Sequence, residues 1–268
     1  DELATAIVGE HRSLLEMSSR EGEPGKPLLA IRRLDGEHGL RVRDLTVRRG
    51  QIVGLTGLNG AGRTSLLKAL FGVDSFQGEV YLEGRPYRPR SPRAAIRRGV
   101  GLVPEDRKTE GLLLGAALYK NTTLPVLRNH TLVGQGPLAA MAREWLERLD
   151  AKFRTVYQPA SQLSGGNQQK VVVSKWLLDG SRLLLLDEPS RGLDVGAKAD
   201  MYELIRELAE GGAAVLVTSS ELDELYAHCD SIWVMHEGEN IHEFDPKVHE
   251  RAAILHSVIS GRRQAVDG

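Results

Sequence analysis

The glycine-rich segment GLNGAGRTS, residues 57–65, constrains the fold of this chain more than any other feature of the sequence. It follows the apolar run QIVGLT, typical of a buried strand, and precedes TSLLKALF, typical of a helix. Three glycines let successive backbone N–H groups point toward one anion, and the helix start adds its positive end. The segment therefore predicts a phosphate-binding loop in which Thr64 supplies a hydroxyl for Mg²⁺. The alternative is an ordinary glycine-rich turn between a strand and a helix.

Two further motifs favour the phosphate-binding interpretation. The run LLLLDEP, residues 183–189, ends in two carboxylates, of which Asp187 can hold Mg²⁺ and Glu188 can polarise an attacking water. Taken alone, two acids at a strand end are often a helix cap. The run LSGGNQQK, residues 163–170, opens a second helix whose N-terminus also suits an anion. One nucleotide does not need two such cradles, so the second requires an explanation.

The rest of the chain alternates between strand-like and helix-like segments. The runs QIVGLT, LLLL and AVLV lack the alternation of a half-exposed strand, as expected of parallel strands buried on both faces. SPRAAIRR predicts a helix with Ser91 as its N-cap and Pro92 at its first position. PLAAMAREWLERLD predicts a helix with one apolar face. That face consists of Leu138, Met141, Ala142, Trp145, Leu146 and Leu149.

Composition limits the class of protein. The net charge is -1, from 35 basic and 36 acidic residues, so no overall field favours nucleic acid or an anionic membrane. Cys229 is the single cysteine and excludes an internal disulfide; a lone thiol of this kind is typical of buried packing. The start DELATAIVGEHR lacks the apolar core of a signal peptide, and no apolar run approaches the ~18 residues of a membrane span. We expect another chain to supply any membrane span.

The order of the motifs resembles one family. A phosphate loop, then LSGG, then LLLLDEP, then SRGLD, over about residues 28–245, is similar to the nucleotide-binding domain of ABC transporters. The resemblance implies an α/β P-loop NTPase fold of ABC type, with a mixed-sheet core, an antiparallel β subdomain and a helical subdomain. It also implies paired domains that face head to tail. Each ATP then lies between the phosphate loop of one domain and the LSGG of the other, which explains the second cradle.

The same resemblance assigns roles to individual residues. It implies ATP and Mg²⁺ as cofactors, with Glu188 as the catalytic base and Mg²⁺ held by Thr64, Asp187 and, as a third ligand, Glu105. Asp194 of SRGLD is implied to cross the interface between paired domains. The residues implied for this chain's own ATP are Gly57, Leu58, Asn59, Gly60, Ala61, Gly62, Arg63, Thr64, Ser65, Glu105 and Ser220. Those implied for the partner's ATP are Leu163, Ser164, Gly165, Gly166, Asn167 and Gln168.

Four positions depart from the family's pattern, and all concern one site. Arg63 replaces a lysine, and its planar fork cannot act as a compact charge between the β- and γ-phosphates. Glu105 replaces a glutamine and brings negative charge beside the γ-phosphate, while Ser220 replaces a histidine. By alignment, Leu34 takes the place of an aromatic ring that stacks on adenine, a contact worth roughly 1–3 kcal/mol. We therefore expect this half-site to bind nucleotide weakly and to turn it over slowly, while LSGG completes the competent site of the other half.

Ser220 also has a simpler interpretation. It can be the N-cap of the following helix, with Asp223 three residues later completing an S-x-x-D box. The cap and the loss of an imidazole at this position do not exclude each other.

A finer resemblance comes from GAGRT, the EDRK-x-EGL run (105–112), LSGGNQQK, DEPSRGLDVGAK and SSELDEL. Together they are similar to the second ATP-binding domain of the tandem ATPases that drive ribose-, galactose-, arabinose- or xylose-type carbohydrate importers. This implies ATP hydrolysis coupled to solute uptake, with weak or no activity in the isolated domain, although no residue specifies the solute. The implied partners are a homologous N-terminal domain of the same polypeptide, two membrane-spanning permease subunits and, indirectly, an extracytoplasmic solute-binding protein, with no nucleic acid. The implied location is the cytoplasmic face of the membrane.

The predicted domain boundaries follow from this resemblance and from a weak repeat. Residues 1–17 favour a short helix and 18–27 a linker, and ELATAIVG (2–9) resembles HERAAILHSVISG (249–261). We expect residues 1–27 to be the tail of a preceding homologous domain plus a linker. Residues 28–268 are then the nucleotide-binding domain, with a helical subdomain at about 106–178 whose first part, 106–135, carries the docking surface for the membrane subunit.

Two other functions stay open from the sequence. One is a soluble ABC ATPase acting on DNA or ribosomes, supported by the arginine-rich run RPYRPRSPRAAIRR; a solvated helix face is the plainer interpretation of that run. The other is a regulatory nucleotide-binding module without hydrolysis, although a binding-only site has no need of Glu188. The arginines concerned are Arg85, Arg88, Arg90, Arg93, Arg97 and Arg98.

Overall fold

The computed structural model describes residues 25–129 and 134–262, so the predicted N-terminal helix and most of the linker lie outside the described residues. The strands are β1 (Pro27–Gly36), β2 (Arg41–Arg48), β3 (Ile52–Thr56), β4 (Phe76–Leu82), β5 (Arg85–Pro86), β6 (Val100–Val103), β7 (Leu183–Asp187), β8 (Ala214–Thr218), β9 (Ser231–His236) and β10 (Glu239–Phe244). The α-helices are α3 (Arg63–Phe71), α4 (Pro92–Arg97), α5 (Leu118–Thr123), α6 (Gln135–Arg148), α7 (Gly165–Leu178), α8 (Val195–Glu210), α9 (Leu222–His228) and α10 (Arg251–Ser260).

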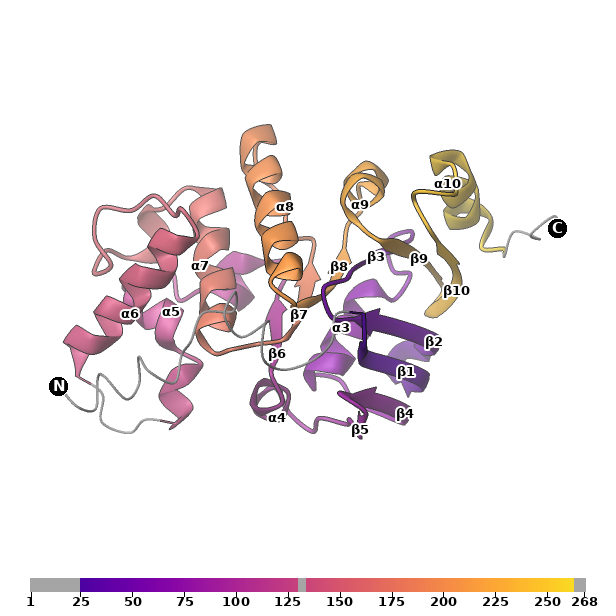
Figure 1. The fold of residues 1–268 in the computed structure, drawn as a ribbon, viewed down its shortest axis with the longest axis horizontal. Helices are drawn as coiled ribbons and strands as arrows, with labels where there is room; N and C mark the ends of the chain where they lie inside the picture. Colours follow the sequence, from indigo (N-terminus) through magenta and orange to yellow (C-terminus); the bar gives the residue numbers. More distant parts are fainter. Residues whose placement is uncertain (1–24, 130–133, 263–268) are drawn as a thin grey trace.

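One mixed sheet runs through the described part of the molecule, with ten strands in the order β5-β4-β1-β2-β10-β9-β3-β8-β7-β6. Strands β9, β3, β8, β7 and β6 are parallel to one another. Strands β1, β2, β4 and β5 form an antiparallel group, drawn in indigo and purple at the lower right of Figure 1. The two parts meet where Glu239 of β10 pairs with Arg41 of β2. The predicted mixed-sheet core and antiparallel β subdomain are confirmed.

The central strands β3, β7 and β8 are buried at every position. Helices cover them, with α3 against β6 and β7, α9 against β3, and α8 against β8. Parallel strands covered on both faces need no polar alternation, which is why their apolar runs were recognisable in the sequence. Strand β10, ENIHEF, was missed because charged and histidine residues fill much of it.

The helical subdomain consists of α5, α6 and α7, which pack against one another at one side of the molecule (Figure 1). The predicted apolar face of α6 is buried, including Trp145 and Leu146. Helix α7 is also joined to the core, because Trp176 contacts Phe71 edge to face with ring centroids 5.7 Å apart. Gly101 of β6 lies under the same indole, where a Cβ would approach Trp176 Cγ to 2.7 Å. Helix α7 is therefore fixed to the sheet by a close contact that admits only glycine at position 101.

Two local predictions are confirmed in the described residues. Ser91 caps α4, since its Oγ accepts a hydrogen bond from the Ala94 N–H at 3.3 Å, and Pro92 takes the first helical position. Cys229 is buried, and burial raises the pKa of its thiol, so it is packing rather than a reactive group.

Candidate functional site

The carboxyl ends of three neighbouring strands bring the motifs together. Strand β3 leads into the glycine-rich loop, β7 ends at Asp187, and β8 ends at Thr218. The Thr218 hydroxyl joins two of these ends, because it donates to Asp187 Oδ1 at 2.7 Å and accepts from the Glu188 N–H at 2.9 Å. Ligand sites of open α/β sheets lie at this edge. The geometry therefore places the loop, the two acids and the residues after β8 around one space.

Glycine is required in the loop by close backbone approaches. Gly57 has φ 153°, and a Cβ there would lie 2.4 Å from the Met235 carbonyl oxygen. Gly62 has φ 99°, and its Cβ would lie 3.0 Å from Gly238 Cα. The Gly238 N–H also donates to the Ala61 carbonyl at 3.0 Å. The loop is thus seated on the turn between β9 and β10, which fixes its shape without a ligand.

A cavity of about 360 Å³ opens above this loop. Glu105, Glu188, Arg191 and Ser220 face it together with the loop itself. Gly57 and Leu58, which were also predicted to bind ATP, do not line this cavity. The predicted own-site residues that line it are Asn59, Gly60, Ala61, Gly62, Arg63, Thr64, Ser65, Glu105 and Ser220.

An ion pair crosses this cavity. Arg63 Nη1 donates to Glu188 Oε1 at 2.9 Å, and the two side chains are only 11% and 8% exposed. The second carboxylate oxygen of Glu188 accepts from the Ser220 hydroxyl at 3.2 Å. Glu188 also has a left-handed backbone, with φ 47°, which few non-glycine residues adopt. Both oxygens of the predicted base are therefore engaged by Arg63 and Ser220, two of the four residues that depart from the family's pattern.

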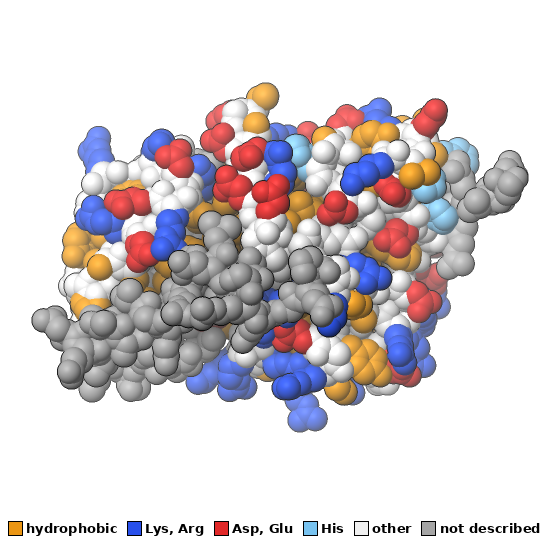
Figure 2. Space-filling view, in the orientation of Figure 1, with side chains coloured by type: hydrophobic (Ala, Val, Ile, Leu, Met, Phe, Trp, Pro, Cys, Tyr) orange, Lys and Arg blue, Asp and Glu red, His pale blue; other side chains and the backbone are white. Residues whose placement is uncertain are grey.

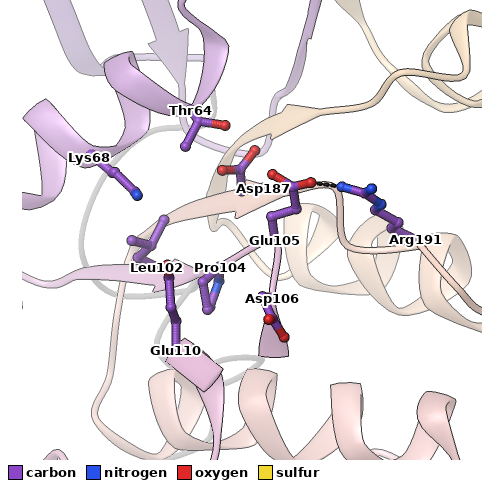
Figure 3. A pocket seen from close by; sticks show the side chains of 9 residues that line it. All are labelled: Thr64, Lys68, Leu102, Pro104, Glu105, Asp106, Glu110, Asp187 and Arg191. Carbon is purple, nitrogen blue, oxygen red and sulfur yellow. Dashed lines mark ion pairs between the residues drawn. The ribbon is translucent and has the colours of Figure 1, made fainter. Parts of the chain in front are cut away.

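A second cavity, of about 480 Å³, shares Thr64, Glu105 and Arg191 with the first (Figure 3). The three predicted Mg²⁺ ligands, Thr64, Asp187 and Glu105, point into the same space, and an ion pair joins Glu105 to Arg191. Hydroxyl and carboxylate oxygens are the donors that Mg²⁺ prefers. Among the described residues no group of three His, Cys, Asp or Glu side chains could hold a metal by itself. The donor set fits an ion that completes its shell with phosphate oxygens and water.

Sequence reasoning missed three basic residues of this region. Arg191 lines both cavities, and Lys68, one helical turn after Thr64, points into the second (Figure 3). Arg107 Nη1 donates to the Arg191 carbonyl at 3.1 Å, and its Nε lies 3.4 Å from Gln168 Oε1. The available signals were the spacing of Lys68 on the helix and the presence of Arg191 inside SRGLD. Arg107 therefore connects the segment that carries Glu105 to α7.

The predicted partner-facing residues lie at the start of α7, and none of them lines the first cavity. Ser164 is the N-cap and is exposed, and its Oγ accepts from Asn167 Nδ2 at 2.8 Å. Ser164, Gly166 and Asn167 line a small cavity of about 110 Å³. Leu163 and Gln168 are buried instead, and Gln168 Nε2 donates to the Leu163 carbonyl at 3.2 Å. Within this chain these two side chains pack inside the turn, and their role at the partner's nucleotide stays a prediction.

Asp194 caps α8, with its Oδ1 accepting from the Ala197 N–H at 2.9 Å. It is exposed and lies outside both cavities of this chain. Its role at an interface between paired domains stays a prediction.

Two predictions about side chains near the cavity are wrong. Ser220 does not cap α9, since the helix begins at Leu222 after Glu221 and has no side-chain cap. The Ser220 hydroxyl bonds to Glu188 instead, because that carboxylate comes close in the fold. Leu34 is fully buried in β1, between Val42 and Gly78 of the flanking strands, so it cannot lie against a base.

The carboxylate of Glu224, which does not line the cavity, bonds to side chains from several segments of the chain. Its Oε2 accepts from the hydroxyls of Ser190 at 2.7 Å, Tyr202 at 2.8 Å and Ser219 at 2.9 Å, and Lys198 lies 3.0 Å from Oε1. Burial alone would raise the pKa of Glu224, but these hydrogen bonds hold it below its ordinary value. Glu224 thereby fixes the segments that carry Glu188 and Ser220.

Comparison with known proteins defines the class. The family model described as ABC transporter matches residues 40–191, more than half of the chain. The chain therefore belongs to the ABC transporter family. A solved ATP-binding cassette of an ABC transporter, MJ1267 in its ADP conformation, matches with a TM-score of 0.70 at 19% identity, covering 88% of this chain and 96% of that one. This confirms the fold of ABC type and its helical subdomain.

Among curated relatives, the chain is similar to proteins named for ribose import. Ribose import ATP-binding protein RbsA 1 of Rubrobacter xylanophilus is 42% identical over 99% of this chain and 54% of its own length. RbsA of Pseudomonas putida is 48% identical over 80% of this chain and 43% of its own length. The chain thus spans about half the length of these relatives. No helix in the described part of the chain is long and apolar enough to cross a membrane.

Proposed function

We propose that this chain is the second ATP-binding domain of a carbohydrate importer ATPase, which couples ATP binding and hydrolysis to uptake of a monosaccharide. The proposal is supported by curated relatives of about twice the matched length that are named ribose import ATP-binding proteins. Residues 28–268 form this domain, and residues 1–27 are the tail of a homologous N-terminal domain with its linker. The protein then lies at the cytoplasmic face of the membrane.

A groove in the described residues supports docking of a permease subunit. It has a volume of about 730 Å³ and lies between α3, α4, α7 and the segment after α5. Val73, Leu124 and Leu127 on its wall are exposed apolar side chains, which are costly to leave in water. The groove includes part of the predicted docking segment, 106–135. Two permease subunits, and through them an extracytoplasmic solute-binding protein, are the proposed partners.

The residues around the cavities fit ATP and Mg²⁺. The backbone N–H groups of the loop and the start of α3 would hold the phosphates, and Thr64 and Asp187, with Glu105 as a third ligand, would hold Mg²⁺. The metal would neutralise charge on the phosphates. Glu188 is placed to accept a proton from water once it is free of Arg63.

We further propose that this half-site is weak and that the start of α7 completes the competent site of the other half. The ion pair between Arg63 and Glu188 carries this proposal. A phosphate that binds Arg63 must take it from Glu188, and leaving a buried carboxylate without its partner is costly. The Glu188 side chain then competes with the phosphate for Arg63, in addition to its role as a base. Binding and turnover at this site should both be reduced.

Reversion tests the weak half-site. The substitutions Arg63→Lys, Glu105→Gln and Ser220→His are made together in the tandem protein, with the other half-site inactivated at its own catalytic carboxylate. We expect ATP turnover to rise at least about tenfold, because the compact ammonium reaches the phosphates and Glu188 is released. Arg97→Lys, on the exposed face of α4, is the matched control. If the triple variant turns over ATP no faster than this control, the half-site is not limited by these residues.

A regulatory module without hydrolysis is the second candidate, because Glu188 is fully engaged in this structure. The two candidates differ in the variant Glu188→Gln combined with the three reversions. Loss of the regained turnover supports hydrolysis at this site. ATP binding without any regained turnover in the three reversions supports the regulatory module.

A further inference from the structure

A cluster of arginines along β5, α4 and the segment between them forms no ion pair within the described residues. The five side chains are exposed, and no ion pair or hydrogen bond joins any of them to another described residue. Figure 2 shows basic side chains gathered along the lower edge, where Figure 1 places β5 and α4. We call these residues the arginine patch: Arg85, Arg88, Arg90, Arg93 and Arg97.

Other arginines on the surface behave differently. Arg41 pairs with Glu239 at 2.6 Å, Arg148 with Glu144 at 2.6 Å, and Arg143 with Glu147 at 3.9 Å. The chain as a whole has a net charge of -1. The arginine patch is therefore a local concentration of positive charge on a chain that is nearly neutral overall.

The backbone that carries the arginine patch is firmly held. The Tyr87 hydroxyl donates to the Leu70 carbonyl at 2.7 Å, and Ser91 caps α4. Ala95 of the same helix is fully buried. Arg98, the next basic residue, turns inward and stacks on Tyr87 at 5.6 Å. The five remaining guanidinium groups thus extend from an ordered platform.

The arginine patch adjoins the apolar groove, because Arg93 belongs to the patch and also lines the groove. On the proposed function, the groove receives a permease subunit, so this face lies near the bilayer surface. We propose that the arginine patch binds the anionic headgroups of membrane phospholipids beside that subunit. Guanidinium forks bind phosphate oxygens in pairs, and clustered basic residues are attracted to anionic leaflets. This inference rests on the proposed function for its orientation and extends it to a lipid partner.

The surroundings favour lipid over nucleic acid. Single-stranded nucleic acids stack their bases on exposed aromatic rings. Tyr87 is the one aromatic residue among residues 85–97, and it is buried. The chain has a near-zero net charge, so it does not produce the broad basic field typical of nucleic-acid binding proteins. A compact basic cluster beside exposed apolar residues suits the boundary between headgroups and a membrane protein.

Vesicle binding by this chain tests the proposal without a permease. Sedimentation is measured with phosphatidylcholine vesicles and with vesicles in which about 30% of the lipid is phosphatidylglycerol. We expect binding to the anionic vesicles alone, and binding that decreases as salt is raised. The variant Arg88→Glu, Arg90→Glu, Arg93→Glu should lower the partition coefficient at least roughly tenfold. Circular dichroism and thermal unfolding establish that the variant is folded.

The control variant is Arg41→Glu, Arg143→Glu, Arg206→Glu, which makes the same charge change at exposed, ion-paired sites. It should retain most of the binding. An equal loss in both variants, or equal binding to both kinds of vesicle, overturns the proposal. Patch-dependent binding to duplex DNA that exceeds binding to anionic vesicles overturns it in favour of nucleic acid. None of these outcomes affects the reversion experiment, because that experiment measures turnover in the tandem protein.

Discussion

The phosphate-loop cavity and the start of α7 both combine glycines with a helix N-terminus, but they differ in how their own side chains are used. In the cavity, Arg63 is paired with Glu188 and Arg191 with Glu105. At the start of α7, Ser164 is exposed and its hydroxyl meets only Asn167 within the described residues. The difference teaches that glycines define the shape of a phosphate cradle, while the nearby charges decide whether it is available to a ligand.

The largest effect is expected at the start of α7. In the tandem protein, Ser164→Arg should lower ATPase activity about 100-fold, or about 3 kcal/mol in activation free energy, because a long side chain blocks the partner's nucleotide. Ser161→Arg, on the exposed turn before it, should have little effect. Glu188→Gln should cost less than about twofold if its half-site contributes as little as proposed. Steady-state rates of the three variants decide whether the two cradles differ as described; the reverse order of effects contradicts the comparison.

The second largest effect is expected from a change at the contact between α7 and the sheet. Gly101→Ala places a methyl group against Trp176 and should reduce the free energy of unfolding by about 2 kcal/mol. Gly115→Ala is the control, because a Cβ there meets nothing within 4 Å. Urea unfolding measures both variants. Equal stability of the two would show that the indole moves aside easily, and that α7 is less firmly positioned than the cavity.

Arg107→Ala should uncouple the two regions. Its guanidinium joins the segment carrying Glu105 to the Arg191 carbonyl and to Gln168 at the start of α7. We expect a roughly tenfold lower kcat in the tandem protein with KM for ATP nearly unchanged, because binding groups remain while the orientation of α7 is relaxed. Arg143→Ala on α6 is the control. A rise in KM without a fall in kcat would show that Arg107 supports binding rather than orientation.

The smallest effect concerns pH. Burial lowers the pKa of Lys175 to about 8, although its ammonium donates to the Gly111 carbonyl. The unfolded chain therefore binds more protons than the folded one above pH 8, and the destabilisation from Lys175 is fully present below that pH. From pH 8 to pH 9 the wild-type free energy of unfolding should rise by about 1 kcal/mol relative to Lys175→Met. The exposed-site variant Lys152→Met should follow the wild type; parallel curves for Lys175→Met would contradict the assignment.

The sequence predicted the features that depend on local pattern. Continuous apolar runs located the buried parallel strands, and Ser-Pro at 91–92 located a capped helix, because neighbouring residues determine both. The loop, Asp187 and Glu188 could also be brought together in advance, since the ends of parallel strands share one edge.

The features that were missed depend on partners distant in the sequence. Ser220 could have been a cap, but a carboxylate 32 positions away accepts its hydrogen bond. Leu34 could have faced a ligand, but the register of three strands turns it into the core. The pairing of Arg63 with Glu188 joins residues 125 positions apart and has no local signal. These contacts, rather than the motifs, decide whether the side chains of the cavity are bonded to one another or available to a ligand.

The carboxylate of Glu224 anchors the frame behind the cavity without touching the cavity itself. Framework and reactive groups are thereby maintained by separate sets of side chains. An engineer could exchange the reactive set while the frame stays assembled. If the half-site is as weak as proposed, a few substitutions in the reactive set should restore it.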